Sequence, residues 1–360
     1  MLLVKLKITE LVKVPTKTVE DEKCSNLGCI SINEANGKNC MFAVKAGQND
    51  GVAVLYYYPD MSDLTTRKHF IIYGAGHANG MTIDSNYIYI TTWSNKNIDE
   101  NEGISNEIMQ IPKNLFNTLS SGSVVPEKSN STGGIELLQP MKINTDPQTK
   151  EDNPYVKYTE SFSSITKHKK DNTFIIKKNI NGVSGTAYEK DFSFTTAKII
   201  KINGNRTFVV SENTDDMFIV KNNLDYKNVT SQDICYNEGN GLFLPKWYGS
   251  YNKTKSVILW ADIDTTPSYV NIKGVSYKYF EPDIISVDMS ERMTYGVLKY
   301  STYEYESVAF TPERDLIVAC NIVYTSDYVN AYKENNDGKS PGSDRIIRIR
   351  KSGGGKFTVN

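Results

Sequence analysis

Residues 76–93 read GHANGMTIDSNYIYITTW, and this stretch has the form of a β-hairpin. Met81 and Ile83 alternate with polar residues and are followed by three residues that favour turns, Asp-Ser-Asn. A second alternating run, Ile-Tyr-Ile, then leads into a polar tail. Two short alternating runs separated by turn residues are typical of two paired antiparallel strands.

The same pattern recurs along the chain, each time with an apolar anchor residue in the first strand. These anchors are Ile30, Met81, Ile165, Ile199, Ile234 and Val308. Their irregular spacing fits units of three or four strands with insertions at some joints. Repetition of one hairpin without long helical patterns predicts an all-β fold, a β-propeller with six blades. A large β-sandwich, whose strands also alternate, is the other interpretation.

We expect a single propeller domain over residues 1–360, with insertions near 112–158, 262–305 and 320–344. The run Val4-Lys5-Leu6-Lys7-Ile8 has the period of a strand, and we expect it to pair with the C-terminal strand and close the propeller. Its lysines interrupt any apolar core, so it does not have the pattern of a signal peptide. The protein is therefore expected in the cytoplasm, or released by a non-classical route.

The composition limits the classes of partner. The chain has 41 Lys and Arg against 42 Asp and Glu, which gives a net charge of −1. This balance provides no general attraction to nucleic acid, so we expect no nucleic-acid partner. No run approaches the roughly 18 apolar residues of a membrane span, so no transmembrane segment is expected. With a mean hydropathy of −0.44 the chain is predicted to be a soluble protein.

Loop lengths differ between the two ends of the predicted propeller. Turns between the first and second strand of each unit are short, whereas loops after the second strand are long, as over residues 93–106 and 320–344. In a propeller these long loops lie on the same face as the starts of the innermost strands. Because function usually lies on loops held by a rigid scaffold, we expect the functional site on this loop-rich face.

Polar residues lie at or beside the predicted starts of the innermost strands. They are His77, Asn79, Gln232, Asp233 and Glu306. Oxygen-bearing side chains around one axis can hold a hard cation such as Ca²⁺, and Asn79, Asp233 and Glu306 are the candidate ligands. The same positions could also place a general base. The other interpretation is a polar channel lining that binds only water. Nucleophile motifs such as GxSxG and HExxH are absent.

Two tryptophans occupy corresponding places in different units. Trp93 ends the second strand of one unit, and Trp247 follows the second strand of another. Exposed tryptophans beside Asn and Asp suit sugar rings or a protein partner, because they offer apolar area together with a hydrogen-bonding edge. The other interpretation is that these rings pack between blades.

Three phrases of the chain, GHANGMTID, SQDICYNEGNGLFLP and YESVAFTPERDLIVA, resemble motifs of the helveticin J-like bacteriocin family. The resemblance implies a bacterial β-propeller that binds or acts on the envelopes of other cells, and it assigns no catalytic residues. The chain also resembles six-bladed lactonases of the gluconolactonase type, which hold a divalent cation with Glu, Asn and Asp. That resemblance implies Asn79, Asp233 and Glu306 as ligands, although their order along the chain departs from the order usual in that family.

These observations predict a recognition protein, bacteriocin-like and directed to a cell envelope, whose loop-rich face binds a carbohydrate or protein surface without a cofactor. The predicted ligand-binding residues are His77, Asn79, Trp93, Gln232, Asp233, Trp247 and Glu306. The alternative is a lactonase-like hydrolase or lyase that uses Ca²⁺ at the mouth of the central channel. The sequence favours binding over catalysis but leaves both open.

Overall fold

The computed structural model describes residues 6–35, 37–92, 107–129, 133–160, 163–180, 182–224, 229–231, 233–248, 255–285, 301–324, 329–330, 333–334 and 344–351. In these residues the named elements are mainly strands. The named helices are short and lie in connecting segments, η1 (Leu64–Thr66), α1 (Leu115–Thr118) and η2 (Thr214–Asp216), and residues 329–330 and 333–334 are also helical. The protein is therefore all-β, as the sequence predicts.

The hairpin of the stretch quoted first is present. β7 (Met81–Ile83) pairs antiparallel with β8 (Tyr87–Thr91). Asp84 explains the tight turn, because its carboxylate accepts hydrogen bonds from the backbone N–H groups of Asn86 and Tyr87, both at 2.8 Å. Bonds of this kind from a side chain to nearby backbone are the reason that Asp is favoured in turns.

The described strands form five sheets. The first contains β2 (Lys17–Val19), β3 (Glu22–Ala35), β4 (Lys38–Gly47), β5 (Val52–Tyr58) and β6 (Lys68–Tyr73). The second contains β7, β8, β9 (Ile108–Pro112) and β10 (Glu136–Leu138). The fourth contains β18 (Val229–Ser231), β19 (Cys235–Asn237), β20 (Gly241–Tyr248), β21 (Lys255–Ala261) and β24 (Asp283–Ile285). The fifth contains β25 (Ser301–Phe310), β26 (Leu316–Tyr324), β27 (Asp344–Lys351) and β1 (Leu6–Lys13).

The third sheet is the largest. Its inner part contains β13 (Ile165–Lys167), β14 (Thr173–Lys177), β15 (Phe192–Ile202) and β16 (Asn205–Val210). Its outer part contains β11 (Pro140–Ile143), β12 (Tyr155–Lys157), β17 (Phe218–Val220), β22 (Ser268–Ile272) and β23 (Val275–Phe280). Parallel pairing joins β11 to β16 and β23 to β17, so segments far apart in the sequence extend this sheet.

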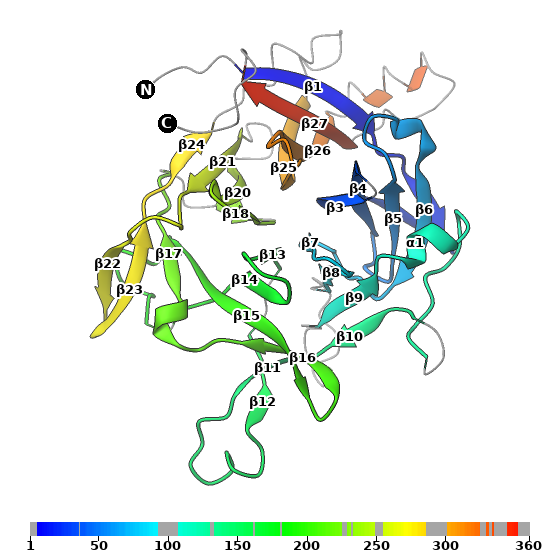
Figure 1. The fold of residues 1–360 in the computed structure, drawn as a ribbon. Coiled ribbons are helices and arrows are strands. Elements are labelled where there is room, and N and C mark those ends of the chain that lie inside the picture. Colours follow the sequence, from blue (N-terminus) through cyan, green and yellow to red (C-terminus); the bar gives the residue numbers. More distant parts are fainter. Residues whose placement is uncertain are drawn as a thin grey trace.

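The five sheets are arranged around a centre (Figure 1). One strand of each sheet lies innermost, namely β3, β7, β13, β19 and β25, and each contacts the innermost strand of the next sheet, with β25 contacting β3. Neighbouring sheets also share an apolar core, the fifth and first included, where Ile317 and Ile346 pack with Ile30 and Val54. The arrangement is propeller-like. The described strands do not form two sheets packed face to face, as a β-sandwich would.

The predicted count of six blades is not confirmed. The unit predicted around Ile199 is not separate, because Ala197 and Ile199 belong to β15, which pairs with β14 and β16 as the third strand of its sheet. Both faces of β15 pack against apolar neighbours, so its residues repeat the pattern of an innermost strand. Alternation of apolar residues in the sequence shows that a strand packs against apolar neighbours. It does not show how far the strand lies from the central axis of the propeller.

The first described strand pairs with the last. β1 runs antiparallel to β27, from Leu6 opposite Lys351 to Lys13 opposite Arg345. The two lie side by side at the outer edge of the fifth sheet (Figure 1). The N-terminal segment is therefore a strand of the fold, as its alternation predicts.

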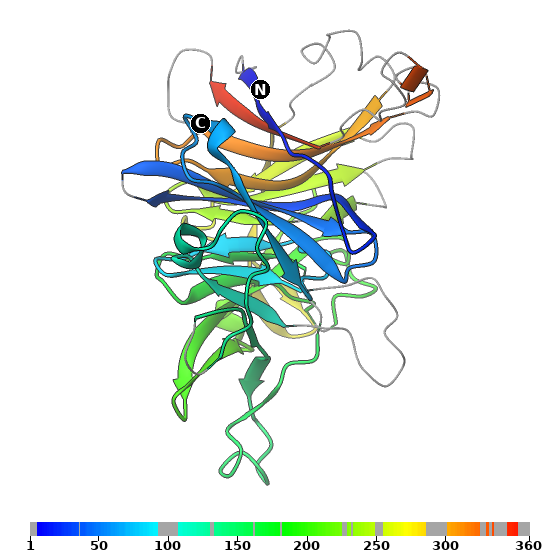
Figure 2. The same ribbon diagram turned by 90° about the vertical axis from the view of Figure 1, so that its right-hand side faces the viewer.

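The predicted insertions contain structure of their own. Residues 112–158 contain α1 and β10 to β12, and the hairpin of β11 and β12 projects from the body (Figures 1 and 2). Residues 262–305 contain β22 to β24. Much of the third segment, 320–344, lies outside the described residues.

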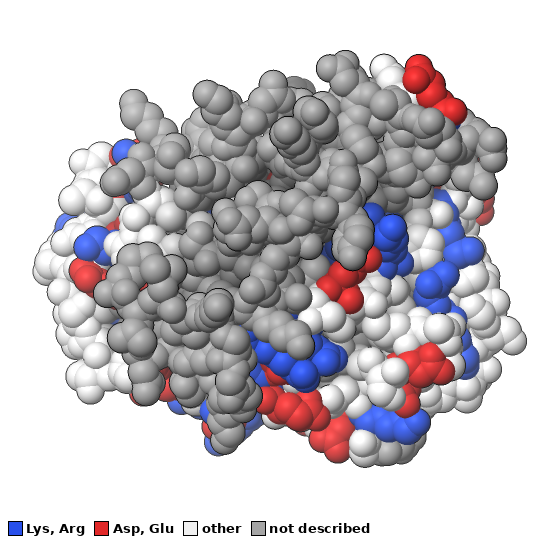
Figure 3. Space-filling model, turned by 90° about the horizontal axis from the view of Figure 1, so that it is seen from above, with Lys and Arg blue, Asp and Glu red and all other residues white. Residues whose placement is uncertain are grey.

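Charged side chains of both signs are interspersed on the described part of the surface seen in Figure 3. This distribution fits the nearly balanced composition of the chain. In the described part of the chain, no helix has the length and apolar character needed to cross a membrane.

Candidate functional site

The two ends of the ring differ, and they are named here by their connections. The short-turn end contains the turns from each innermost strand to the next strand, at residues 37, 84–86, 168–172, 238–240 and 311–315. The loop-rich end contains the starts of the innermost strands, which touch one another. A Cβ on Gly28 would lie 2.6 Å from the Ala78 carbonyl oxygen, and one on Gly80 would lie 2.9 Å from that of Ser163. Only glycine permits this approach, which brings the starts of β3, β7 and β13 close together.

His77 lies at this end just before β7, and its Nδ1 contacts the carboxylate of Asp50 in the connection between β4 and β5. The imidazole is only 22% exposed. Ala78, the next residue, has a φ of 48°, which marks a sharp bend at the strand start. Asn79 follows and is buried. His77 is thus held by a hydrogen-bonding partner, the role expected for a structural histidine.

Asp233 is fully buried, whereas the sequence places it at an open channel mouth. Its Oδ2 accepts a hydrogen bond from Ser307 Oγ at 2.5 Å, and its Oδ1 accepts one from the backbone N–H of Ile234 at 2.8 Å. Burial raises the pKa of Asp233 well above its ordinary value, against the opposing effect of these two hydrogen bonds. The carboxyl therefore joins the innermost strands of the fourth and fifth sheets in a dry environment.

Glu306 is also buried. It lies at a register shift in β25 between Tyr305 and Ser307, and its Oε1 accepts a hydrogen bond from Asn321 Nδ2 at 2.9 Å. Burial raises its pKa well above the ordinary value, and the neighbouring carboxylate of Glu304 raises it further. A β-bulge changes the direction of a side chain, and here the carboxyl of Glu306 contacts Asn321 of β26.

Three predicted ligand-binding residues cannot be placed as side chains. Trp93 and Gln232 lie outside the described residues. Trp247 is described only by its backbone, which pairs with Thr230 and Ser256 inside β20. The predicted aromatic surface therefore stays a prediction.

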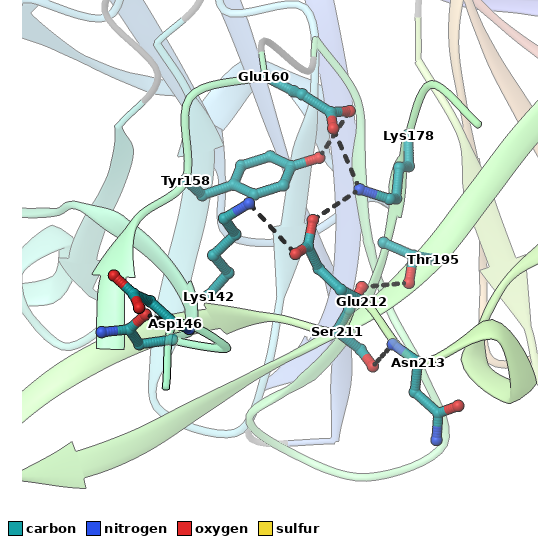
Figure 4. Close-up of polar contacts among 10 residues, drawn as sticks. Lys142, Asp146, Tyr158, Glu160, Lys178, Thr195, Ser211, Glu212 and Asn213 are labelled. Carbon is teal, nitrogen blue, oxygen red and sulfur yellow. Dashed lines mark hydrogen bonds and ion pairs between the residues drawn. The ribbon is translucent and has the colours of Figure 1, made fainter. Parts of the chain in front are cut away.

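A charged cluster at the third sheet was not found from the sequence (Figure 4). Lys178, nearly buried, lies between the carboxylates of Glu160 and Glu212 at 3.2 and 3.3 Å, and 5.1 Å from the centre of the Tyr158 ring. Lys142 of β11 also pairs with Glu212, at 3.2 Å. These contacts tie the projecting hairpin to β14 and β16, so the cluster stabilises an insertion and compensates a buried charge.

A central cavity of about 240 Å³ is the feature to which every sheet contributes. Its walls come from all five innermost strands, and its opening lies at the short-turn end, where Lys169 and the exposed Glu238 line it. The cavity was not predicted from the sequence. The missed signal is a small residue directly after each true anchor, namely Ser31, Thr82, Thr166, Cys235 and Ala309.

Hydroxyl groups among these small residues bridge the innermost strands. Thr82 Oγ1 accepts a hydrogen bond from the backbone N–H of Lys167 at 2.8 Å, and Thr166 Oγ1 accepts one from that of Tyr236 at 2.9 Å. The side chains are therefore fixed by the scaffold and leave space at the axis.

The opening of the central cavity carries charges that are largely compensated. Lys167 pairs with Asp171 at 2.6 Å, and Lys169 pairs with Asp264 at 2.8 Å. Asp264 also accepts a hydrogen bond from the hydroxyl of Tyr236. A ligand at this opening meets polar groups of both signs with little net charge.

Within the described residues, no three His, Cys, Asp or Glu side chains come together where they could hold a metal ion. The predicted ligand set of Asn79, Asp233 and Glu306 includes the amide of Asn79, which is not one of these four residue types. The observation therefore does not test this set. The carboxyls of Asp233 and Glu306 are engaged by Ser307 and Asn321, respectively. The cation site stays a prediction.

No known family model matches the chain, and no curated protein matches it in sequence. Among solved structures, it is similar to a candidate glycoside hydrolase from Parabacteroides distasonis ATCC 8503, with a TM-score of 0.39 and 10% identity over 97% of this chain and 95% of that one. It is similar to a glucose dehydrogenase, with a TM-score of 0.36 and 7% identity over 96% and 100%. It is also similar to a bifunctional GH43-CE protein of Bacteroides eggerthii, with a TM-score of 0.35 and 10% identity over 81% and 33%. Similarities this low carry no argument about function.

Proposed function

We propose that this protein is a recognition protein that binds an uncharged carbohydrate, and that the ligand enters the central cavity from the short-turn end. The observation that carries the proposal is that one cavity is lined by the innermost strand of every sheet. A site built on all five sheets is rigid, and rigid concave sites with a few placed polar groups are where small ligands bind in proteins.

The lining of the central cavity favours a sugar among small ligands. Apolar side chains such as Ile234 and Val308 form part of the wall, and Ser31, Asn237 and Glu238 add hydroxyl, amide and carboxylate groups. A sugar ring presents C–H faces and hydroxyl groups that suit such a mixed surface. Because Lys167 and Lys169 are both paired with carboxylates, the opening favours an uncharged ligand over an ion.

The more specific predictions from the sequence remain proposals. Binding through the loop-rich face depends largely on loops outside the described residues. The envelope-directed, bacteriocin-like role rests on the sequence resemblance alone. The hydrolase or lyase alternative requires a cation at Asn79, Asp233 and Glu306, and the effect of Ca²⁺ on the melting temperature tests it.

The isoleucines that belong to the lining of the central cavity provide a local test. We expect neutral mono- and disaccharides to shift the NMR signals of Ile30, Ile83 and Ile234, which line the cavity, while Ile272 and Ile347, buried elsewhere, stay unchanged. Glu238→Ala should weaken binding several-fold, because one charged hydrogen-bonding group at the opening is lost. Glu151→Ala, an exposed acid on the projecting hairpin, is the matched control. Sugar-induced shifts confined to other residues, or no shifts with any sugar of the panel, would overturn the proposal.

A further inference from the structure

A second pocket of about 430 Å³ lies between the first and second sheets at the short-turn end. Its lining comes from the ends of β3 and β5, the start of β4, the turn between β7 and β8, and the segment after β9. It shares no lining residue with the central cavity. The two are separate sites that open on the same end of the molecule.

The inner wall of the second pocket is aromatic. Phe42 and Tyr57 are both buried, and their rings stack with centroids 4.6 Å apart and an interplanar angle of 14°. Tyr87 adds a third, half-buried ring, held by Arg206, whose guanidinium lies 4.6 Å from its centroid. Fixed aromatic surfaces of this kind bind the apolar face of a ring.

The rim of the second pocket is rich in side-chain amides. Asn33, Asn86, Asn114 and Asn117 all line it. Asn114 precedes α1 but its side chain makes no capping hydrogen bond to that helix. Amides offer both donors and acceptors, which matches the hydroxyl groups of a sugar.

Lys113 is the charged group of the second pocket. It is half-buried, and within the described residues its amine has no ion-pair partner. The nearby carboxylates are already engaged, since Asp84 accepts hydrogen bonds from its own turn and Asp171 pairs with Lys167. Burial lowers the pKa of Lys113, and this loss of water outweighs the opposing attraction of the Asp84 and Asp171 carboxylates.

The backbone holds Lys113 in place, because its N–H donates to the Asn86 carbonyl oxygen at 2.9 Å. From these observations we infer that the second pocket binds a sugar that carries a carboxylate, such as a uronic acid, with the carboxylate at Lys113 and the ring against the aromatic wall. A single ammonium matches a monoanion, whereas phosphate sites usually gather several N–H donors. The inference does not depend on the ligand of the central cavity.

The test compares sugars that differ only in the acidic group. We expect glucuronate to bind at the second pocket about tenfold or more tightly than glucose, as measured by titration of the NMR signal of the Ala35 methyl group, because a hydrogen bond to a charged group is added. Raising the salt concentration should reduce that preference. Glucuronate should shift the NMR signal of the Ala35 methyl group, which lines the second pocket, and leave Ile234 of the central cavity unchanged.

Lys113→Gln keeps the length and polarity of the side chain and removes its charge. We expect this variant to bind glucuronate and glucose equally, while Lys198→Gln, at an exposed lysine of β15, keeps the preference. Equal binding of the two sugars by the natural protein would overturn the inference. A preference for glucuronate that remains in Lys113→Gln would also overturn it. So would a glucuronate-induced shift of the Ile234 signal without a shift of the Ala35 signal.

Discussion

Ser307 Oγ donates a hydrogen bond of 2.5 Å to Asp233 Oδ2, across the boundary between the fourth and fifth sheets. The same hydroxyl accepts a hydrogen bond from the backbone N–H of Ile30 in the first sheet, at 3.1 Å. One side chain therefore connects the innermost strands of three successive sheets. Cys29, next to Ile30, is also buried beside Asp233, and its pKa is raised by burial and then by that carboxyl. Buried polar groups therefore join these three strands.

Ser307→Ala should destabilise the protein by about 1–3 kcal/mol, because it leaves one Asp233 oxygen and the Ile30 N–H buried without these partners. The free energy of unfolding in urea at neutral pH measures the change. Ser120→Ala, at an exposed position, is the control and should change stability by less than about 0.5 kcal/mol. Equal effects of the two substitutions would show that the Ser307 bridge contributes nothing.

Glu306→Gln should alter the dependence of stability on pH. Because the pKa of Glu306 is raised in the folded state, the folded protein keeps a proton that the unfolded chain loses above pH 4.5, the ordinary pKa of this group. The free energy of unfolding should therefore fall as the pH rises above 4.5, by up to about 1.4 kcal/mol per pH unit from this group. Urea unfolding between pH 4.5 and 7.5 should show a smaller fall for Glu306→Gln. Asp233 contributes a fall of the same sign in both proteins, and a pH profile unchanged by Glu306→Gln would contradict the prediction.

Calcium ions should leave the melting temperature unchanged at neutral pH. Ca²⁺ needs ionised carboxylates, whereas burial raises the pKa values of Asp233 and Glu306 well above their ordinary values. Thermal unfolding with and without millimolar Ca²⁺ measures this. A rise in the melting temperature that disappears in Asp233→Asn and Glu306→Gln would instead support the hydrolase or lyase alternative.

Lys246→Met should stabilise the protein. The lysine is fully buried, and its amine lies 3.8 Å from the centre of the Phe192 ring without a hydrogen-bond partner among the described residues. Burial lowers its pKa well below the ordinary value. An apolar side chain of similar length removes a desolvation cost of about 1–3 kcal/mol at neutral pH. At Lys246 the folded protein binds fewer protons than the unfolded chain. The free energy of unfolding of the natural protein should therefore rise as the pH approaches 10.5, the ordinary pKa of lysine, and Lys246→Met should lose that rise. Exposed Lys198→Met is the control, and a destabilised Lys246→Met would contradict the prediction.

Local structure was predictable because it depends on neighbours in the sequence. The turn at Asp84 and the pairing of β7 with β8 follow from residues within one short stretch. The number of units was not predictable. β15 repeats the apolar pattern of an innermost strand, although it is the third strand of its sheet. The residue after the anchor distinguishes an innermost strand from a strand such as β15. Ile199 is followed by the large Ile200, whereas the five true anchors are followed by small residues that let adjacent innermost strands approach.

The candidate site was predictable only as a set of positions. The strand starts do meet at one end, yet sequence position did not reveal that Asp233 faces Ser307 in a dry interior and that Glu306 turns toward Asn321 at a bulge. The second pocket joins residues from Asn33 to Asn117, and no local pattern links them. Lys113 stands out only once the structure shows that its potential partners are engaged elsewhere.

The buried ion pair between Lys45 of β4 and Asp344 of β27 connects the first and fifth sheets, so it tests how the ring holds together. Lys45 also donates to Thr16 Oγ1 at 3.0 Å, in the segment after β1. Lys45→Met should destabilise the protein by about 3–5 kcal/mol, because it leaves a buried carboxylate without its counter-ion. Lys45→Met combined with Asp344→Asn should cost less than the sum of the single changes, by about 1 kcal/mol or more in a double-mutant cycle of urea unfolding. Lys38 and Asp60 form an exposed pair at 2.6 Å, and the same cycle there should give less than about 1 kcal/mol. Strict additivity of Lys45→Met and Asp344→Asn would show that the two sheets are not joined at this point.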